Sequence, residues 1–494
     1  MSNIRRSLAY TIADSYLALP LQIVGTMVIS RLLTPVETGV FAVAAVFASL
    51  ASTFRDFGVA EYLIQEKELN HEKIRAAFAV NIATSWAMGL LLYFCAPQVG
   101  AFYRNQGVAD VMRVQAFSFF LIPFGAVVMA NFRRQLDFRP IFIAGVLTNL
   151  TTFVVGSVCA LRGLGSMSLA WSSLAGVVVT VGTSLWYRPA DFPIWPGIKG
   201  IGTVFHFGKF ASGIYIFGQI GKGAPEMVIG RAQDMAGAAL FSRSSGLIEI
   251  FNRTVLRSVM PVCLPYFAKS GRESGGITTG YLRSVSYITV IGWPFLAFVG
   301  LVAYSAIRIV YGDQWIASVP LAQILCLVGA VELVHYLAKE ALMAGGDIKR
   351  SNTLQMCIQA SRIAGVLAVI PFGLTGACWG LLVAAIVGAM VSQWHLSASL
   401  GLRALEVLRA CIPSVYITLL SVAPVALWVA YEGISEANFL RYAYAGGAIT
   451  ASAWLWAVRH FQHPIWRELT AVFHQMLQKY QTRQRPLKPD AGPP

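Results

Sequence analysis

Six basic side chains lie inside strongly apolar stretches of the sequence, where a charge is costly. A Lys or Arg in such a stretch is expected to face a bundle interior or a water-filled cavity. The guanidinium group binds phosphate oxygens through paired, charge-assisted hydrogen bonds, so these residues predict an anionic passenger such as a diphosphate. The predicted substrate-binding residues are Arg55, Lys222, Arg243, Arg253, Arg257 and Arg362. For those near helix ends, the alternative is a side chain that extends to the membrane interface.

Three acidic residues in apolar stretches are predicted to serve gating or ion coupling: Asp14, Asp56 and Glu226. Asp14 and Asp56 are expected at similar depth near the cytosol, as a gate or as a structural ion pair with Arg55. Glu226 follows Lys222 by four residues, so both side chains share one helix face. Glu226 is therefore predicted either to couple transport to an ion or to neutralise Lys222.

A further group is predicted between two later helices, where Glu332, His335 and Arg362 could cluster. His335 is interpreted there as a packing residue rather than a proton relay.

The seventh apolar stretch contains a predicted hinge at Gly221, Gly223 and Pro225. Glycine and proline weaken a helical hydrogen-bond ladder, and interrupted membrane helices commonly line substrate sites. No nucleotide-binding or hydrolase motif is present, and the seven cysteines form no CxxC pair, so neither metal nor cofactor is predicted.

The elements that must position these residues are membrane helices. The 494 residues are 56% apolar and 12% charged, with a mean hydropathy of +0.62. A spanning helix needs about 20 mostly apolar residues. About fourteen are predicted, near 8–30, 38–60, 76–96, 114–131, 141–161, 165–186, 208–230, 236–262, 285–307, 319–338, 352–370, 375–398, 410–431 and 441–459.

The net charge of +15 reflects basic residues spread between these stretches rather than a nucleic-acid-binding patch. With the N-terminus in the cytoplasm, 25 of the 38 Lys and Arg residues fall in cytoplasmic segments and seven fall outside. Positively charged loops favour the cytoplasmic side. The sequence therefore predicts a multi-pass inner-membrane protein with both termini in the cytoplasm.

An internal repeat relates the two halves of the chain. Ile29-Ser-Arg31, followed by Gly39-Val-Phe41, matches Ile229-Gly-Arg231, followed by Ala239-Leu-Phe241, at an offset of 200 residues. Both motifs join an odd-numbered helix to the next, which predicts a parallel repeat of six helices. The predicted division is an N-terminal bundle at 1–190, a second bundle at 205–400, two further helices at 408–460 and a basic tail at 461–494.

The run from Ile29 to Ala44, together with Arg55-Asp-Phe-Gly58 and Glu226-Met-Val-Ile-Gly-Arg231, resembles the polysaccharide transporter family. These are Wzx-type flippases of the multidrug/oligosaccharidyl-lipid/polysaccharide exporter superfamily. The resemblance implies an all-α membrane protein in which two bundles surround a central cavity. It also implies alternating-access transfer of an undecaprenyl-diphosphate-linked oligosaccharide to the periplasmic leaflet, for exopolysaccharide, capsule or lipopolysaccharide synthesis. A polysaccharide polymerase and chain-length proteins are further candidate partners.

Two other functions remain open from the residues. A drug or cation antiporter of the same superfamily would share the fold, although arginines in its cavity would repel cationic drugs. A membrane-embedded glycan polymerase usually carries a large extramembrane loop or an Asp-x-Asp site, and the sequence contains no Asp-x-Asp. Transport rather than catalysis is the favoured interpretation.

Overall fold

A computed structural model describes residues 18–471 apart from 19, 57, 194, 273–275 and 469. The side chains of 56, 203, 205–216, 257, 258 and 261 are also outside the description. Within these limits the chain is built from helices joined by short turns, with no β-strand. Residues 20–32 are helical, and the earlier part of the predicted first helix lies outside the described residues.

The longer helices follow the predicted ranges and mostly extend beyond them at both ends. They are α2 (Pro35–Asp56), α4 (His71–Phe102), α5 (Gln106–Arg134), α6 (Arg139–Leu161), α7 (Ser166–Trp186), α8 (Ile201–Ala232), α9 (Met235–Phe251), α10 (Arg257–Arg272), α11 (Gly276–Leu301), α13 (Val319–Val334), α15 (Ile348–Val369), α16 (Gly373–Leu400), α17 (Ala404–Glu432) and α18 (Phe439–His460). The shorter ones are α3 (Val59–Gln65), α12 (Ala303–Val310) and α14 (Ala338–Ala344), with 3-10 turns at Asp313–Ser318 and Ile370–Phe372.

Nine helical stretches of the described chain are long and apolar enough to cross a membrane. The predicted all-α, polytopic membrane fold is confirmed. The count of fourteen spanning helices stays a prediction.

Several predicted single helices are interrupted, each for a local reason. The range 38–60 is divided because Gly58 adopts a left-handed conformation with φ of 67°, after which α3 begins. The range 236–262 contains a π-helical segment, Asn252–Leu256, between α9 and α10. This is where charged residues already interrupted the apolar pattern.

Side-chain caps define where the helices start. Before α2, the backbone N–H of Thr34 donates to Glu37 Oε2 at 2.8 Å, which satisfies a free donor at the helix entrance. Asn70 caps α4 by accepting from the Lys73 N–H at 2.9 Å. Asn105 caps α5 by accepting from the Gly107 N–H at 2.9 Å. These caps keep the turns between helices short.

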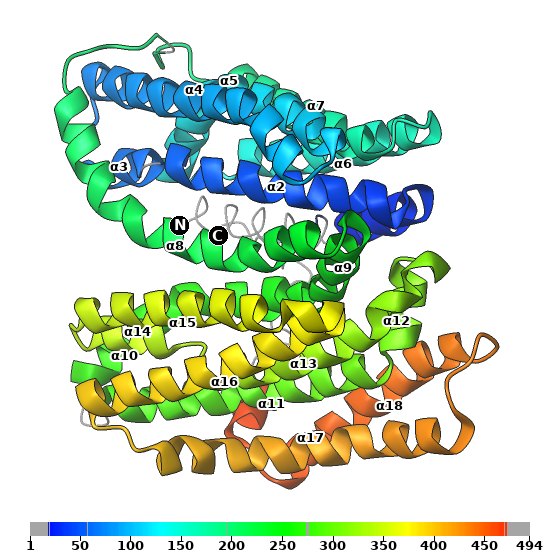
Figure 1. The fold of residues 1–494 in the computed structure, drawn as a ribbon. Coiled ribbons are helices and arrows are strands. Elements are labelled where there is room, and N and C mark those ends of the chain that lie inside the picture. The colour runs from blue at the N-terminus through cyan, green and yellow to red at the C-terminus, as the bar shows by residue number, and fades with distance from the viewer. Residues whose placement is uncertain are drawn as a thin grey trace, which may run out of the picture. The chain divides into compact units, whose positions relative to one another are not determined.

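By packing, the chain divides into two compact units. Unit 1 comprises Met1–Ile250, Ala303–Val328 and Ile348–Val391. Within it α5 packs against both α4 and α7, α6 packs against α7, and α8 packs against α2 and α15 (Figure 1). The bundles predicted at 1–190 and 205–400 are a different division, based on the sequence repeat and on a shared central cavity. They stay a prediction.

Unit 2 comprises Phe251–Val302, Gly329–Asp347 and Ser392–Pro494. Here α17 packs against both α11 and α18. The chain after α18 turns back on this unit: His463 is buried and its Nε2 lies 2.8 Å from Ser286 Oγ of α11. An ion pair of 3.1 Å joins Arg283 to Glu468. The first part of the predicted tail is therefore packed against α11, and residues 472–494 lie outside the described chain.

Candidate functional site

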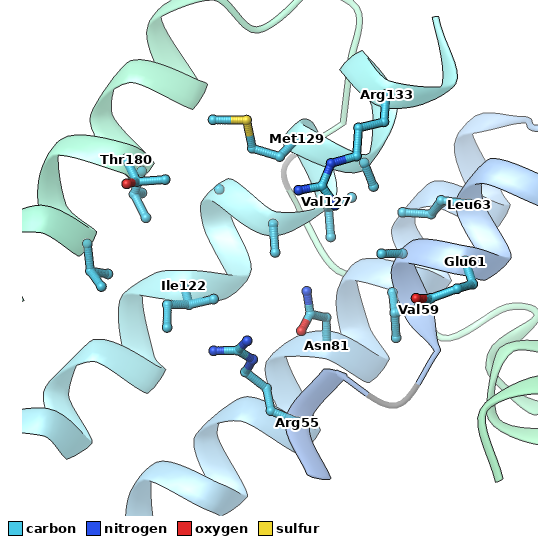
Figure 2. Close-up of a pocket in the computed structure, with 16 residues that line it drawn as sticks. Arg55, Val59, Glu61, Leu63, Asn81, Ile122, Val127, Met129, Arg133 and Thr180 are labelled. Carbon is cyan, nitrogen blue, oxygen red and sulfur yellow. The ribbon is translucent and has the colours of Figure 1, made fainter. Parts of the chain in front are cut away.

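A cavity of about 380 Å³ opens in unit 1 between α2, α3, α4, α5 and α7. Figure 2 shows Arg55 and Arg133 extending into it from α2 and α5, with the Asn81 amide of α4 between them. Thr180 of α7 also lines the wall, and its hydroxyl group lies 2.6 Å from that of Thr148 on α6. Ile122, Val127, Met129, Val177 and Val181 contribute apolar surface. The described lining thus combines two cations, the Glu61 carboxylate and two uncharged polar groups with a hydrocarbon wall.

Arg55 lies in the last turn of α2 and is half-buried. Its guanidinium carbon lies 5.6 Å from the centre of the Phe119 ring on α5, within the range of a cation–π contact. The aromatic face lies within reach of the positive charge and supports it. Arg55 is the one predicted substrate-binding residue that lines this cavity.

Two consecutive arginines at the end of α5 have different surroundings. Arg134 donates to main-chain carbonyls at the end of α3 and just after it, including Leu63 at 2.7 Å and Glu66 at 2.5 Å. Arg133 is exposed and lines the cavity instead. Within the described chain, its guanidinium makes no hydrogen bond or ion pair. Arg134 therefore holds α3 in place at the edge of the cavity, whereas the hydrogen-bond donors of Arg133 are available to a ligand.

The α3–α4 connection is further stabilised by a charged pair. The Lys73 ammonium donates to Glu66 Oε1 at 3.0 Å. This hydrogen bond lowers the pKa of the Glu66 carboxyl below its ordinary value. The pair and the Arg134 contacts hold α3 beside the cavity.

Glu226 of α8 is half-buried, and its Oε2 atom is buried and makes no hydrogen bond within the described structure. The charge that acts on it is that of Arg362 on α15, a helix that packs against α8. Lys222, the predicted neighbour on α8, is exposed. The structure therefore brings together Glu226 and Arg362, two predicted site residues that the sequence placed in different groups.

Arg243 of α9 is enclosed by aromatic rings. Its guanidinium carbon lies 5.3 Å from the ring centre of Tyr311 and 5.1 Å from that of Trp315. The neighbouring Ser244 hydroxyl donates to the Ser318 carbonyl at 3.0 Å. These contacts attach α9 to the segment around Trp315, so Arg243 has a packing role in this structure.

The remaining predicted residues are described one by one. Arg253 is exposed on the π-helical segment of unit 2. His335 Nε2 lies 3.3 Å from Gln393 Oε1. Asp14 and the side chains of Asp56 and Arg257 lie outside the described residues. Among the described cations of unit 1, Arg55, Arg243 and Arg362 have three different sets of neighbours.

The predicted hinge lies in an uninterrupted helix, since α8 continues through Pro225. Figure 1 shows α8 as a long curved helix. A Cβ atom at Gly221 would overlap the Gln359 side chain of α15, and one at Gly223 would overlap Val46 of α2. These glycines let neighbouring helices approach closely. A hinge at Gly221, Gly223 and Pro225 stays a prediction.

The opposite end of α2 is closely packed. A Cβ atom at Gly39 would overlap the main-chain oxygen of Met235 at the start of α9. The Ser30 carbonyl accepts hydrogen bonds from the Gln314 amide and, at 2.9 Å, from the Trp315 indole. The Arg31 guanidinium donates to the Ile309 carbonyl at 2.7 Å. We call this region, residues 30–40 with 227–246 and 303–318, the Gly39 end.

The two copies of the repeated motif make related contacts at the Gly39 end. In the first copy, Ser30 and Arg31 contact the end of α12 and the turn after it. In the second copy, Arg231 lies 5.1 Å from the ring centre of Phe102 at the end of α4. The Tyr103 hydroxyl donates to the Met227 carbonyl at 3.1 Å, as the Trp315 indole does to Ser30. Each motif thus contacts the turn that follows the third helix of the other predicted repeat.

Sequence reasoning missed three kinds of residue. Arg133 was counted among the basic residues of a cytoplasmic loop, and Arg31 among those of an outer loop. Asn81 and Thr180 gave no signal because uncharged polar residues are common in membrane helices. The sequence shows two consecutive arginines at 133 and 134, but it does not show which of them has a structural role and which could bind a ligand.

Comparison with known proteins places the chain among polysaccharide biosynthesis proteins. A model of the family described as "Polysaccharide biosynthesis protein" matches residues 28–320. The teichuronic acid biosynthesis protein TuaB of Bacillus subtilis (strain 168) is 22% identical over 386 residues, 76% of this chain and 79% of the relative. The lipopolysaccharide biosynthesis protein WzxC of Escherichia coli (strain K12) is 22% identical over 388 residues, 76% and 77% of the two chains.

A third relative is the succinoglycan biosynthesis transport protein ExoT of Rhizobium meliloti (strain 1021), 23% identical over 334 residues and 66% of each chain. Among solved structures, lipid II flippase MurJ in an inward closed conformation has a TM-score of 0.71 at 13% identity, covering 93% of this chain and 99% of its own. An inward-facing multidrug resistance MATE transporter has a TM-score of 0.58 at 15% identity, covering 80% and 96%. These likenesses establish the fold.

The predicted resemblance to the polysaccharide transporter family is confirmed by these matches. The family model spans more than half of the 494 residues. The chain belongs to the polysaccharide biosynthesis protein family of multi-pass membrane proteins.

Proposed function

We propose that this protein is a flippase that transfers a lipid-diphosphate-linked oligosaccharide from one membrane leaflet to the other. The single observation that carries the proposal is the cavity that Arg55 and Arg133 line together from two helices of a family fold. Guanidinium groups match the oxygens of a diphosphate in charge and geometry. The uncharged polar groups and the apolar wall suit a sugar that must pass along the helices.

The direction of transfer follows from the proposed topology. With both termini in the cytoplasm of an inner-membrane protein, the cavity with Arg55 faces the cytoplasmic leaflet and the Gly39 end faces the periplasm. The headgroup enters at the Arg55 side while the Gly39 end is packed. Transfer requires that packing to separate, so the protein alternates between two states whose balance the passenger shifts.

Energy for this cycle is proposed to come from an ion gradient acting through Glu226. Its carboxylate has a buried oxygen without a hydrogen bond in the described structure and lies within the electrostatic influence of Arg362. Protonation or cation binding would change that interaction. If Glu226→Gln retains both transport and its dependence on imposed proton or sodium gradients, Glu226 does not couple transport to an ion.

The proposed function is tested with purified protein in proteoliposomes that contain a fluorescent undecaprenyl-diphosphate-linked oligosaccharide. Accessibility of the sugar to a membrane-impermeant lectin is measured over time. We expect the protein to increase the rate of transfer, with no change in the length of the glycan. Transfer at the rate of protein-free liposomes contradicts a flippase, and longer glycans would indicate a polymerase.

The drug antiporter is the second candidate, because the MATE transporter shares the fold. The same liposomes distinguish it when loaded with a cationic dye. Uptake of the dye driven by an ion gradient, in the absence of sugar transfer, would favour the antiporter. Association with a polysaccharide polymerase and chain-length proteins is a further proposal, tested by copurification from the native membrane.

A further inference from the structure

We propose that the Arg133 cavity is the site where the phosphate-bearing headgroup of the lipid carrier first binds, with Arg133 as the outer contact and Arg55 as the inner one. The identity of the ligand rests on the proposed function, whereas the anion site rests on the structure of α2, α4, α5 and α7.

The contrast between Arg133 and Arg134 is the first argument. Both lie in the last turn of α5 and carry the same charge. Arg134 uses its donors on carbonyls of Leu63, Ile64, Glu66 and Lys67. Arg133 makes none of these contacts and points into the cavity (Figure 2). A cation that the fold does not use for itself has its donors available for an external anion.

The position of the two cations is the second argument. Arg55 contacts Phe119, and Phe119 precedes Arg133 by fourteen residues on α5. At about 1.5 Å per residue, Phe119 and Arg133 are roughly 21 Å apart along the helix axis. The Arg55 and Arg133 side chains line one cavity between these two levels. A headgroup entering beside Arg133 therefore meets a second guanidinium deeper along the same wall.

The lining between the cations is the third argument. The Asn81 side chain is 5% exposed and lies between the arginines, where an amide binds an uncharged hydroxyl or a phosphate oxygen. The volume of about 380 Å³ falls in the range of small-ligand pockets. The apolar residues opposite would contact the carbon skeleton of a sugar or the first isoprene unit.

Among the side chains that the structure describes, one acidic residue also lines the cavity, and it opposes an anion. Glu61 of α3 is exposed, so solvent screens its charge. Removal of the Glu61 charge should strengthen anion binding, whereas removal of the Arg133 charge should weaken it.

The test measures binding of undecaprenyl diphosphate to the intact protein in nanodiscs of phosphatidylcholine. We expect Arg133→Gln to weaken binding about tenfold, the lower part of the range for a charge-assisted hydrogen bond, because the side chain is exposed. Arg133→Lys should restore part of the affinity, since it keeps the charge but not the fork. Glu61→Gln should strengthen binding about twofold.

Arg113→Gln is the matched control. Arg113 lies on the same helix, pairs with Asp110 at 3.1 Å and does not line the cavity. Its replacement should leave affinity within twofold. Equal weakening by Arg113→Gln and Arg133→Gln would mean non-specific attraction by net charge and would overturn the site. Wild-type affinity in Arg133→Gln would overturn it as well.

Two competitors identify the source of the phosphate. Inorganic pyrophosphate should compete weakly, and phosphatidylglycerol should not displace the isoprenoid at equal mole fraction. Displacement by phosphatidylglycerol would overturn the assignment to the carrier lipid. The outcome is separate from that for transport: binding that depends on Arg133 without sugar transfer would retain the site and reject the flippase.

Discussion

The two ends of α2 show how one helix can serve opposite purposes. At Gly39 the helix approaches the backbone of α9 so closely that no side chain fits between them. At Arg55, 16 residues later, the same helix borders a cavity of about 380 Å³. Small residues and main-chain hydrogen bonds dominate the first end, and long basic side chains dominate the second. The difference teaches that close helix contact is specified where residues are small, and that a cavity is left where long basic side chains such as Arg55 and Arg133 line the helices.

The largest expected effect comes from adding volume at the Gly39 end. Gly39→Val places a side chain against the Met235 carbonyl, and overpacking of a close contact costs about 1–3 kcal/mol. We expect transport to fall about tenfold or more, because the packed state no longer forms. Lectin-detected sugar transfer in proteoliposomes measures the change.

The control for this variant is Gly182→Val on α7, where an added Cβ meets no atom within 4 Å. That protein should transport at the normal rate. A Gly39→Val protein with wild-type transport would show that the packed end is not needed for the cycle, and the comparison between the two ends would lose its functional meaning.

A smaller effect is expected from Arg31→Gln. Arg31 is exposed, but its guanidinium donates to carbonyls of Arg308, Ile309 and Val310 at the end of α12. Loss of these contacts should weaken the packed state by about 1 kcal/mol, or roughly fivefold in its population. In a variant without native cysteines, a cysteine at the buried Thr38 should then react faster with a soluble maleimide.

Arg162→Gln provides the matched change of charge, since Arg162 is exposed at the end of α6 and outside the Gly39 end. Its maleimide rate should equal that of the parent. Equal rates for Arg31→Gln and the parent would mean that the carbonyl contacts do not hold this end together.

The smallest effect is a pH dependence confined to the Arg55 side. The pKa of Glu66 is lowered by its hydrogen bond from Lys73, so the pair stabilises the α3–α4 connection above the ordinary carboxyl pKa of 4.5. That stabilisation is lost as pH falls below 4.5 through the lowered value. Hydrogen exchange of residues 62–70 should therefore increase at acidic pH relative to neutral pH, after correction for intrinsic rates.

Glu66→Gln should remove this extra acid sensitivity, while exchange of residues 30–40 should be alike in both proteins. An unchanged acid response in Glu66→Gln would assign it to another group.

The membrane fold and family could be predicted from sequence because both rest on long patterns. Apolar stretches of about 20 residues indicate helices that span a lipid bilayer. The motif near Ile29 is continuous in the sequence, so it can be recognised without a structure. The structure then shows an interruption at Gly58 that a hydropathy pattern cannot resolve, whereas charged residues in the sequence already weakened the apolar pattern around Asn252–Leu256. Hydropathy averages over a window and does not detect a single left-handed glycine.

The candidate site could be predicted only in part. Arg55 was found because a charge in an apolar stretch is costly, and Arg243 met the same criterion although aromatic rings enclose it. Arg133 was missed because a basic residue at a helix end is the usual topological signal. Burial and spacing along one helix do not reveal which partner another helix supplies, so Glu226 was assigned to Lys222 rather than to Arg362.

The hydrogen bonds at the Gly39 end have a consequence for how the protein tolerates change. The acceptors that join Ser30, Arg31 and Tyr103 to their partners are main-chain carbonyls. A carbonyl survives almost any replacement of its side chain and does not titrate, so these bonds are independent of the identity of residues 30, 227 and 309 and of pH. Natural sequence drift at the acceptor positions should therefore leave the contact intact, and selection should act on the donors alone. A carrier exposed to a variable external medium would keep the same closed state across acidic and alkaline surroundings.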